Sequence, residues 1–245
     1  MPDAAPTLVT VPCFSGAPWD ATQLSALAPY PVRTMRLPEG LDSVEDYADF
    51  VAGQVADLDD YVLIGDSFGA VISLTLALRQ PADMRALVLS GGFAADPLPA
   101  WKAKAASTSR HLGEGLYRQV TLRFHANQLA SRFDATAEVP HTEADYRQLF
   151  IDNTPAASYS ARVSSVAAFD VRDQLTKVSV PTLLITPADD KLIGEKAAQE
   201  LRDGMPDARE VILPETGHMF RFTHPGLYGR TITEFVEGLD GSRAA

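Results

Sequence analysis

Six short apolar segments, separated by amphipathic stretches, constrain the fold of this chain more than any other feature. They are TLVTVP (7–12), PVRTMRL (31–37), YVLIGD (61–66), RALVLSG (85–91), PTLLITP (181–187) and REVILP (209–214). Each has the length of a strand and looks like a strand of a mostly parallel sheet. Strands that alternate with helices form βαβ units with right-handed crossovers. The pattern predicts an α/β fold, with a mostly parallel sheet of about six strands and helices on both faces.

Two of the intervening stretches carry a clear helical period. The first presents one apolar face, begins after Ser43 as a plausible N-cap, and has acids in its first turn. Its apolar positions are Val44, Tyr47, Phe50, Val51, Val55 and Leu58. The second is a closing helix that we expect to begin at Pro225. Its apolar positions are Tyr228, Ile232, Phe235, Val236 and Leu239.

The alternation breaks once, over residues 95–165, between the fourth and fifth predicted strands. A connection of this length is typical of a disordered insert or of a functional lid. Its large apolar content argues against disorder. The residues concerned are Trp101, Leu116, Tyr117, Phe124, Leu129, Phe133, Tyr146 and Phe150. We therefore predict one domain, a core of residues 1–94 and 166–245 with a helical cap of residues 95–165 inserted after the fourth strand.

Composition limits the environment and the partners of the chain. The 245 residues are 46% hydrophobic, yet no apolar run reaches the eighteen or so residues of a membrane-spanning helix. The N-terminus has an acid and prolines where a signal peptide has basic residues. With Cys13 as the one cysteine, we expect no internal disulfide and a cytoplasmic location. The net charge of −11 makes nucleic acid and anionic membranes poor candidate partners.

A serine between two glycines, in the stretch GDSFG of residues 65–69, follows the third strand and opens a helix. A serine hydroxyl is a weak nucleophile until it is presented to a base and to an incoming carbonyl. A sharp strand-to-helix turn presents it, and glycine at 65 and 69 avoids collisions in that turn. This context matches the nucleophile elbow, so Ser67 is the candidate nucleophile.

From this motif onward the chain resembles the α/β-hydrolase family over nearly its whole length. The resemblance implies a strand order of 2-1-3-4-5-6 and a chain order of serine, acid, histidine. The acid loop of the family matches PTLLITPADDKLIG, where the register favours Asp190, with Asp189 as its nearest rival and Asp96 as a further alternative. The histidine loop matches PETGHMFRFTHPG, which makes His218 the general base.

The resemblance also implies two backbone N–H donors for an oxyanion hole. One is the N–H of Phe68, after the nucleophile, and the other is that of Phe14, in the loop VPCFSGAPW. Pro12 and Cys13 stand where the family normally has His-Gly, which leaves the geometry of this loop open. In the family strand order, the loops of Phe14 and Ser67 meet at one crevice.

Four histidines and one acid near these motifs have less specific interpretations. His224 is expected at the surface or at a helix start, and His111, His125 and His141 to be structural or solvated. We expect the elbow to direct Asp66 away from the nucleophile.

The function implied is a serine hydrolase that cleaves a carboxylic ester through an acyl-enzyme, with no cofactor and no metal. Apolar residues at the motifs favour a small to medium acyl or alkyl ester; beside Phe14 and Phe68 the candidates for substrate binding are Trp101, Met219 and Phe220. The closest resemblance is to small capped carboxylesterases such as the pimeloyl-acyl-carrier-protein methyl ester esterases, partly from AAFDVRDQLTKVSVPTLLI. The same serine would also serve a thioesterase, a lactonase or a carbon–carbon bond hydrolase. A ligand receptor without catalysis is a further alternative.

The cap carries an excess of basic residues in an acidic chain. Residues 100–132 hold one acid, Glu114, against Lys102, Lys104, Arg110, Arg118, Arg123 and Arg132. If residues 116–132 form one helix, Arg118, His125 and Arg132 share a face. Such a face is either an ordinary solvated surface or a surface that steers an anionic substrate or an acyl-carrier protein.

Overall fold

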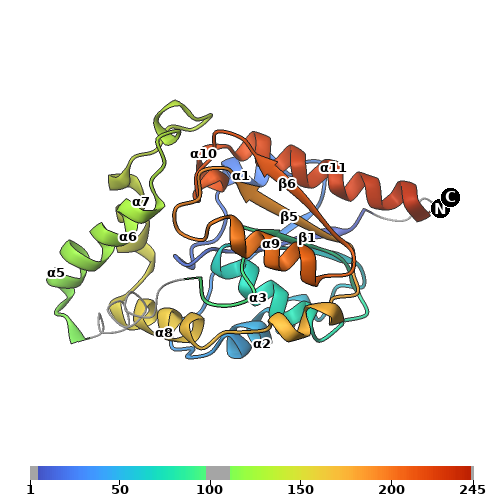
Figure 1. Ribbon diagram of the computed structural model, residues 1–245, viewed down its shortest axis with the longest axis horizontal. Helices are drawn as coiled ribbons and strands as arrows, with labels where there is room; N and C mark the ends of the chain where they lie inside the picture. The colour runs from blue at the N-terminus through green and yellow to red at the C-terminus, as the bar shows by residue number, and fades with distance from the viewer. Residues whose placement is uncertain (1–4, 98–110, 244–245) are drawn as a thin grey trace.

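A single parallel sheet forms the centre of the computed structural model, which describes residues 5–97 and 111–243 (Figure 1). The strand order is β2-β1-β3-β4-β5-β6, and every neighbouring pair is parallel. The strands are β1 (Thr7–Val11), β2 (Val32–Thr34), β3 (Tyr61–Asp66), β4 (Met84–Ser90), β5 (Thr182–Pro187) and β6 (Ala208–Leu213). All six predicted strands are present, and the predicted fold class and strand order are confirmed.

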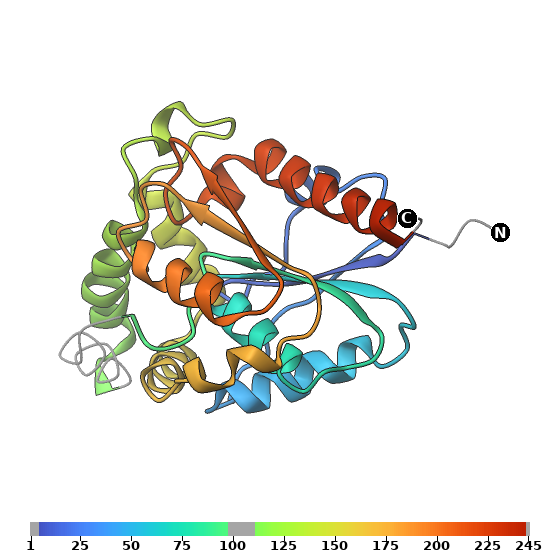
Figure 2. The same cartoon turned by 45° about the vertical axis from the view of Figure 1, so that its right-hand side comes forward.

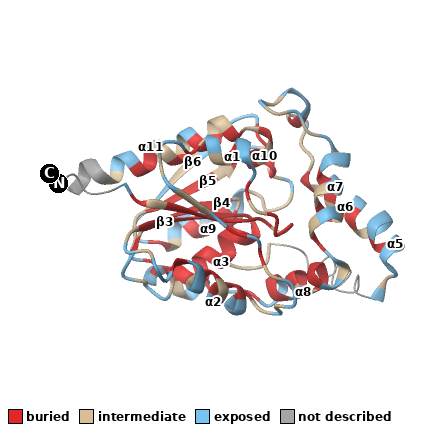
Figure 3. Ribbon diagram, turned by 180° about the vertical axis from the view of Figure 1, so that it is seen from behind, coloured by how far each residue is buried: buried red, intermediate tan, exposed pale blue. Residues whose placement is uncertain are grey.

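Helices cover both faces of the sheet. These are α1 (Ala21–Ser25), α2 (Val44–Val55), α3 (Phe68–Ala77), α9 (Glu195–Gly204), α10 (Phe220–Thr223) and α11 (Pro225–Arg243), with a 3₁₀ turn, η4 (Arg172–Lys177). Adjacent strand residues point to opposite faces, so Val9 packs toward α2, α3 and α9, whereas Leu8 packs toward α11. Figure 3 shows the resulting buried layer of strands between helices whose outer faces are exposed.

The predicted helix ends are largely confirmed. Ser43 caps α2, with its side chain accepting a hydrogen bond from the backbone N–H of Asp46. The helix ends at Val55, so Leu58, predicted on its apolar face, lies beyond it. Pro225 begins α11, where its missing N–H costs no helical hydrogen bond.

Between β4 and β5 the chain forms a group of helices beside the sheet, and we call residues 111–167 the cap. The cap contains α5 (Glu114–Leu116), a π-helical turn η2 (Tyr117–Thr121), α6 (Leu122–Leu129), a 3₁₀ turn η3 (Asp134–Thr136), α7 (Glu143–Asn153) and α8 (Ala156–Ala167). Figures 1 and 2 show most of it at the end of the molecule opposite the two chain termini. An antiparallel β-bridge between Ala95 and Asp170 joins the chain segments that precede and follow the cap. The domain boundaries at 95 and 165 stay a prediction.

The expected helical face of Arg118, His125 and Arg132 is wrong. The π-helical turn adds a residue to the helical repeat before α6, which rotates the residues that follow it. The helix then ends at Leu129, before Arg132. Arg118 and Arg132 are exposed, whereas His125 is partly buried among aromatic side chains.

Within the described part of the chain, every helix is too short or too polar to cross a bilayer.

Candidate active site

Ser67 lies at the sharp turn between β3 and α3, as the elbow motif predicts. Its backbone has φ 54° and ψ −112°, a conformation that non-glycine residues rarely adopt and that costs on the order of 1–3 kcal/mol. The turn is fixed by a hydrogen bond from the Ser67 N–H to the carbonyl of Ser90 on the adjacent strand, at 2.8 Å. The strain is therefore held in place by the sheet itself.

The two glycines of the motif are required by close backbone contacts rather than by their dihedral angles. A Cβ on Gly65 would lie 2.5 Å from the Cα of Ala70, in the first turn of α3. A Cβ on Gly69 would lie 2.6 Å from the carbonyl oxygen of Pro12, in the loop after β1. Because Gly69 has no Cβ, the start of α3 can pack directly against the loop that carries Phe14.

The side chains of Ser67, His218 and Asp190 form one hydrogen-bonded chain. His218 Nε2 lies 2.8 Å from Ser67 Oγ, and His218 Nδ1 lies 2.7 Å from Asp190 Oδ2. Only 3% of the His218 side chain and 5% of the Asp190 side chain are exposed. Gly91, at φ 56°, leaves the space in which the imidazole lies, because a Cβ there would be 3.3 Å from His218 Cε1. The structure thus joins three groups that are far apart in sequence.

Burial and pairing act in opposite directions on these two titratable groups. Burial alone would lower the pKa of His218, but the Asp190 carboxylate, with Asp66 nearby, raises that pKa above its ordinary value. Burial would raise the pKa of Asp190, but His218 and the backbone N–H groups of Ile193 and Leu192 lower it. The pair therefore favours an ionised carboxylate that stabilises a protonated imidazole.

The other acids considered from the sequence have different partners. Asp189 accepts a hydrogen bond from the hydroxyl of Ser131 in the cap, at 2.7 Å. Asp96 lies in the wall of the cavity described below. Asp66 is paired with Arg221 at 2.6 Å, so its carboxylate is engaged below the elbow. Of the alternatives, Asp190 is the acid in contact with His218.

Phe68 is the residue of the elbow directly after Ser67, and Phe14 lies in the loop after β1, in contact with the Phe68 ring. Both line the same cavity as Ser67 and His218, and their ring centroids are 5.6 Å apart. The loop of Phe14 follows β1 and the start of α3 follows β3, and these strands are neighbours in the sheet. Their two backbone segments therefore meet at the serine, which is the crevice expected from the strand order.

The cavity above Ser67 has mainly apolar walls contributed by both core and cap. Its lining residues are Cys13, Phe14, Asp66, Ser67, Phe68, Phe93, Asp96, Pro97, His125, Leu129, Phe150, Tyr159, Val163, Val166, Leu192, Ile193, His218 and Met219. Met219 is among them, as predicted. Phe220 is not: it is fully buried under the sheet and packs on Tyr228, with ring centroids 5.1 Å apart. α10 begins at Phe220, and the Phe220 side chain lies outside the cavity. The proposed contact of Phe220 with substrate is therefore wrong. Trp101 lies outside the described residues.

Comparison with known families decides the classification. Residues 31–222 match the Hydrolase_4 family model, described as "Serine aminopeptidase, S33". The chain is an α/β-hydrolase of this family.

Relatives of this α/β-hydrolase carry several activities in their names. A proposed carbamate hydrolase, RutD, from Variovorax paradoxus is 28% identical over 227 residues, covering 83% of this chain and 77% of that protein. A pimeloyl-[acyl-carrier protein] methyl ester esterase from Aeromonas hydrophila is 26% identical over 239 residues, covering 91% of each. The enol-lactonase from Burkholderia xenovorans has the same fold, with a TM-score of 0.80 at 20% identity over 96% of this chain and 92% of that one.

Three residues of this α/β-hydrolase site are not apparent from the sequence. His125 lines the cavity, 3.2 Å from the Tyr159 hydroxyl, and burial together with nearby His218 lowers its pKa to about 3, so the ring is neutral. Arg162 and Arg221 are 1% exposed and hold the loops of Phe14 and Asp66 respectively. Arg162 and Arg221 would be assigned to the surface from sequence alone, because arginine is seldom fully buried without a partner, whereas His125 is expected only to be structural or solvated.

Proposed function

We propose that this α/β-hydrolase is a serine hydrolase that cleaves a carboxylic ester through an acyl-enzyme. The observation that carries the proposal is the continuous hydrogen-bonded chain from Ser67 Oγ through His218 to Asp190. In the proposed reaction His218 removes the Ser67 proton as Oγ attacks the ester carbonyl, and later donates that proton to the leaving alkoxide. Water, deprotonated by the same imidazole, then releases the acid.

The backbone N–H groups of Phe14 and Phe68 are the proposed oxyanion donors. The positive end of the α3 dipole at Ser67 would add to them. Asp190 would hold the imidazole in the productive tautomer and stabilise its charged form.

An apolar acyl or alkyl group is the proposed occupant of the cavity. Phe14, Phe150, Leu129 and Met219 offer it no charge, and His125 is neutral at physiological pH. The relatives include proteins named for esters, carbamates and an enol-lactone, so the bond cleaved is the open part of the proposal.

Labelling with a fluorophosphonate tests the nucleophile. We expect one modified serine, Ser67, and no reaction in Ser67→Ala. Ser73→Ala is the matched control, because Ser73 is a buried serine within α3, the helix that follows Ser67, and its hydroxyl has no hydrogen-bond partner among the described residues. A protein that binds ligands without catalysis would not be labelled.

A substrate panel tests the bond. We expect esters of short and medium acyl chains to be hydrolysed faster than the matching thioesters, lactones and carbamates. A faster reaction with one of those three classes would replace the ester assignment and leave the nucleophile assignment intact.

A further inference from the structure

The proposed donor Phe14 lies in a tight turn formed by residues 13–16. The turn is closed by a hydrogen bond from the Gly16 N–H to the Cys13 carbonyl, at 2.9 Å, and Gly16 has φ 75°. The Phe14 N–H belongs to the peptide group that joins Cys13 to Phe14. The shape of the turn therefore decides where this N–H points.

Both central carbonyls of the turn accept hydrogen bonds from the cap. Arg162 Nη1, on α8, donates to the carbonyl of Phe14 at 2.7 Å. The hydroxyl of Thr154, just after α7, donates to the carbonyl of Ser15 at 3.0 Å. Thr154 is itself fixed, since its own carbonyl accepts a hydrogen bond from the Tyr117 hydroxyl at 2.9 Å. Two cap side chains thus donate hydrogen bonds to consecutive peptide groups of the turn.

The surroundings of Arg162 are unusual for a buried charge. Among the side chains that the structure describes, residues 5–97 and 111–239, no carboxylate lies within ion-pair distance of its guanidinium. Its remaining donors go to the Tyr47 hydroxyl at 3.2 Å and to the Pro38 carbonyl at 3.5 Å. Burial of a charge without a counter-ion costs several kcal/mol unless neutral acceptors replace the lost water.

The turn is also shaped around this guanidinium. A Cβ at Gly16 would lie 2.8 Å from Arg162 Nη2, so any other residue there would displace the arginine. The guanidinium also donates, through Nε, to the hydroxyl of Tyr47 on α2. Arg162 is therefore fixed between the core and the turn, rather than being a mobile surface side chain.

We propose that Arg162 and Thr154 are positioning residues that hold the oxyanion turn from the cap. The cap then has two roles, forming the cavity and setting the direction of the Phe14 N–H. The inference rests on the proposed function, in which that N–H meets the oxyanion. Misplacement of one such donor reduces kcat more than it weakens substrate binding, because the contact forms in the transition state.

Steady-state kinetics of Arg162→Met and Thr154→Val provide the first test. Each variant keeps the size of its side chain and removes the donor to the turn. We expect kcat to fall at least about tenfold and KM to change less than about threefold. Arg162→Lys, which keeps one donor and the charge, should recover part of the loss. Arg147→Met is the control, because it removes a cap arginine whose hydrogen bond goes to Arg118 within the cap.

Inhibition by a pair of ketones separates positioning from packing. A trifluoromethyl ketone accepts the Ser67 oxygen at its carbonyl carbon, His218 takes the proton, and the carbonyl oxygen becomes an anion in the oxyanion hole. The corresponding methyl ketone binds without this step. In both variants we expect Ki for the trifluoromethyl ketone to rise by the same factor as kcat/KM falls, with Ki for the methyl ketone and the pH inflection of kcat/KM unchanged.

Equal weakening of both ketones, or a rise in KM with kcat unchanged, would show that the two residues only pack the cavity. If Arg162→Met does not fold, Thr154→Val alone decides, since it replaces a hydroxyl by a methyl group of similar shape. Absence of fluorophosphonate labelling and ester hydrolysis in the unmodified protein would instead refute the proposed function.

Discussion

At the scale of single residues, the site depends on positions whose chemistry is set by neighbours far along the chain. His218 and Asp190 are 28 residues apart, and His218 and Ser67 are 151 apart. Gly91 supplies space for the imidazole from yet another strand. The serine, acid and histidine could be predicted because each lies in a loop with a recognisable pattern. The need for glycine at position 91 could not be predicted, because it depends on where the folded chain places the His218 side chain.

The raised pKa of His218 predicts the acid side of the pH profile. Deprotonated imidazole is the proposed base, so kcat/KM should fall as pH decreases through a value above the ordinary 6.5 of histidine. Asp190→Asn removes the charge that raises this pKa, so the inflection should move to lower pH while the plateau falls by about 10³–10⁴-fold. The rate of hydrolysis of one neutral ester, measured from pH 5 to 9, gives both the inflection and the plateau of kcat/KM. An inflection unchanged by Asp190→Asn would mean that another group is titrating.

At the scale of elements, a second buried arginine ties the loops beneath the site together. Arg221, in α10, donates to Asp66 at the end of β3 and to Gln23 in α1, and its guanidinium lies over the rings of Trp19 and Phe222. It joins the loop of His218 to the end of β3, next to the proposed nucleophile Ser67. The network explains how Asp66 is held away from Ser67, as the sequence predicted.

Replacement of Arg221 should destabilise the protein strongly. Arg221→Met leaves the Asp66 carboxylate buried and unpaired, which costs about 3–5 kcal/mol of the free energy of unfolding. The double variant with Asp66→Asn should lose less than the two single losses combined, because no charge is left buried. Arg33→Met is the matched control: its pair with Asp57 is 33% and 70% exposed, so little of the free energy of unfolding should be lost. Urea denaturation of the unmodified protein, the two single variants, the double variant and the Arg33→Met control measures these differences, and strict additivity would contradict the pairing.

The elements themselves were predictable to different degrees for physical reasons. The inner strands β1, β3, β4 and β5 are almost entirely buried and leave nearly continuous apolar runs in the sequence. The edge strands β2 and β6 are only partly buried, and their shorter apolar runs are recognised by their place in the alternation with helices. The helical character of the cap is predictable from its apolar residues, but the π-helical turn at Tyr117–Thr121 leaves no such pattern, so regular helical spacing assigns His125 to the wrong face. Arg162 and Arg221 were missed because their acceptors, Phe14 and Asp66, lie 148 and 155 residues away.

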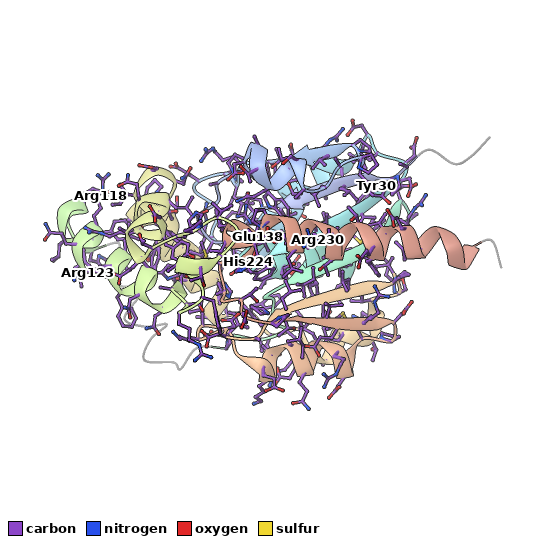
Figure 4. All side chains as sticks on the ribbon, turned by 90° about the horizontal axis from the view of Figure 1, so that it is seen from above. Tyr30, Arg118, Arg123, Glu138, His224 and Arg230 are labelled. Atoms are coloured by element: carbon purple, nitrogen blue, oxygen red, sulfur yellow. The ribbon has the colours of Figure 1, made fainter. Side chains whose placement is uncertain are left out.

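At the scale of the whole molecule, the cap is attached to the core at several separate points. Glu138 accepts hydrogen bonds from the N–H groups of Gly226 and Leu227, at the start of α11, and Figure 4 shows it beside that helix. A carboxylate there also meets the positive end of the helix dipole. Ser131 contacts Asp189 at a second point, and Arg162 and Thr154 hold a third. These contacts place the cap firmly over the cavity.

A group of exposed arginines on the cap opposes the net charge of the molecule, which gives the steering proposal a test. The chain carries −11 overall, yet Arg118, Arg123 and Arg132 are exposed on the cap, where Figure 4 shows Arg118 and Arg123. Glu114 neutralises part of this surface through its pair with Arg118, at 2.9 Å. Lys102, Lys104 and Arg110 lie outside the described residues.

If the cap steers anionic substrates, kcat/KM for an ester with a distal carboxylate should fall as salt rises from 20 to about 200 mM, because the Debye length shortens to under 10 Å. A neutral ester of equal length should show no such dependence. Arg118→Glu with Arg132→Glu should abolish the salt effect and lower kcat/KM for the anionic ester, without changing the neutral one. A rate on the anionic ester that instead rises with salt would mean that repulsion by the net charge of −11 dominates its approach, and the basic residues of the cap would then be an ordinary solvated surface.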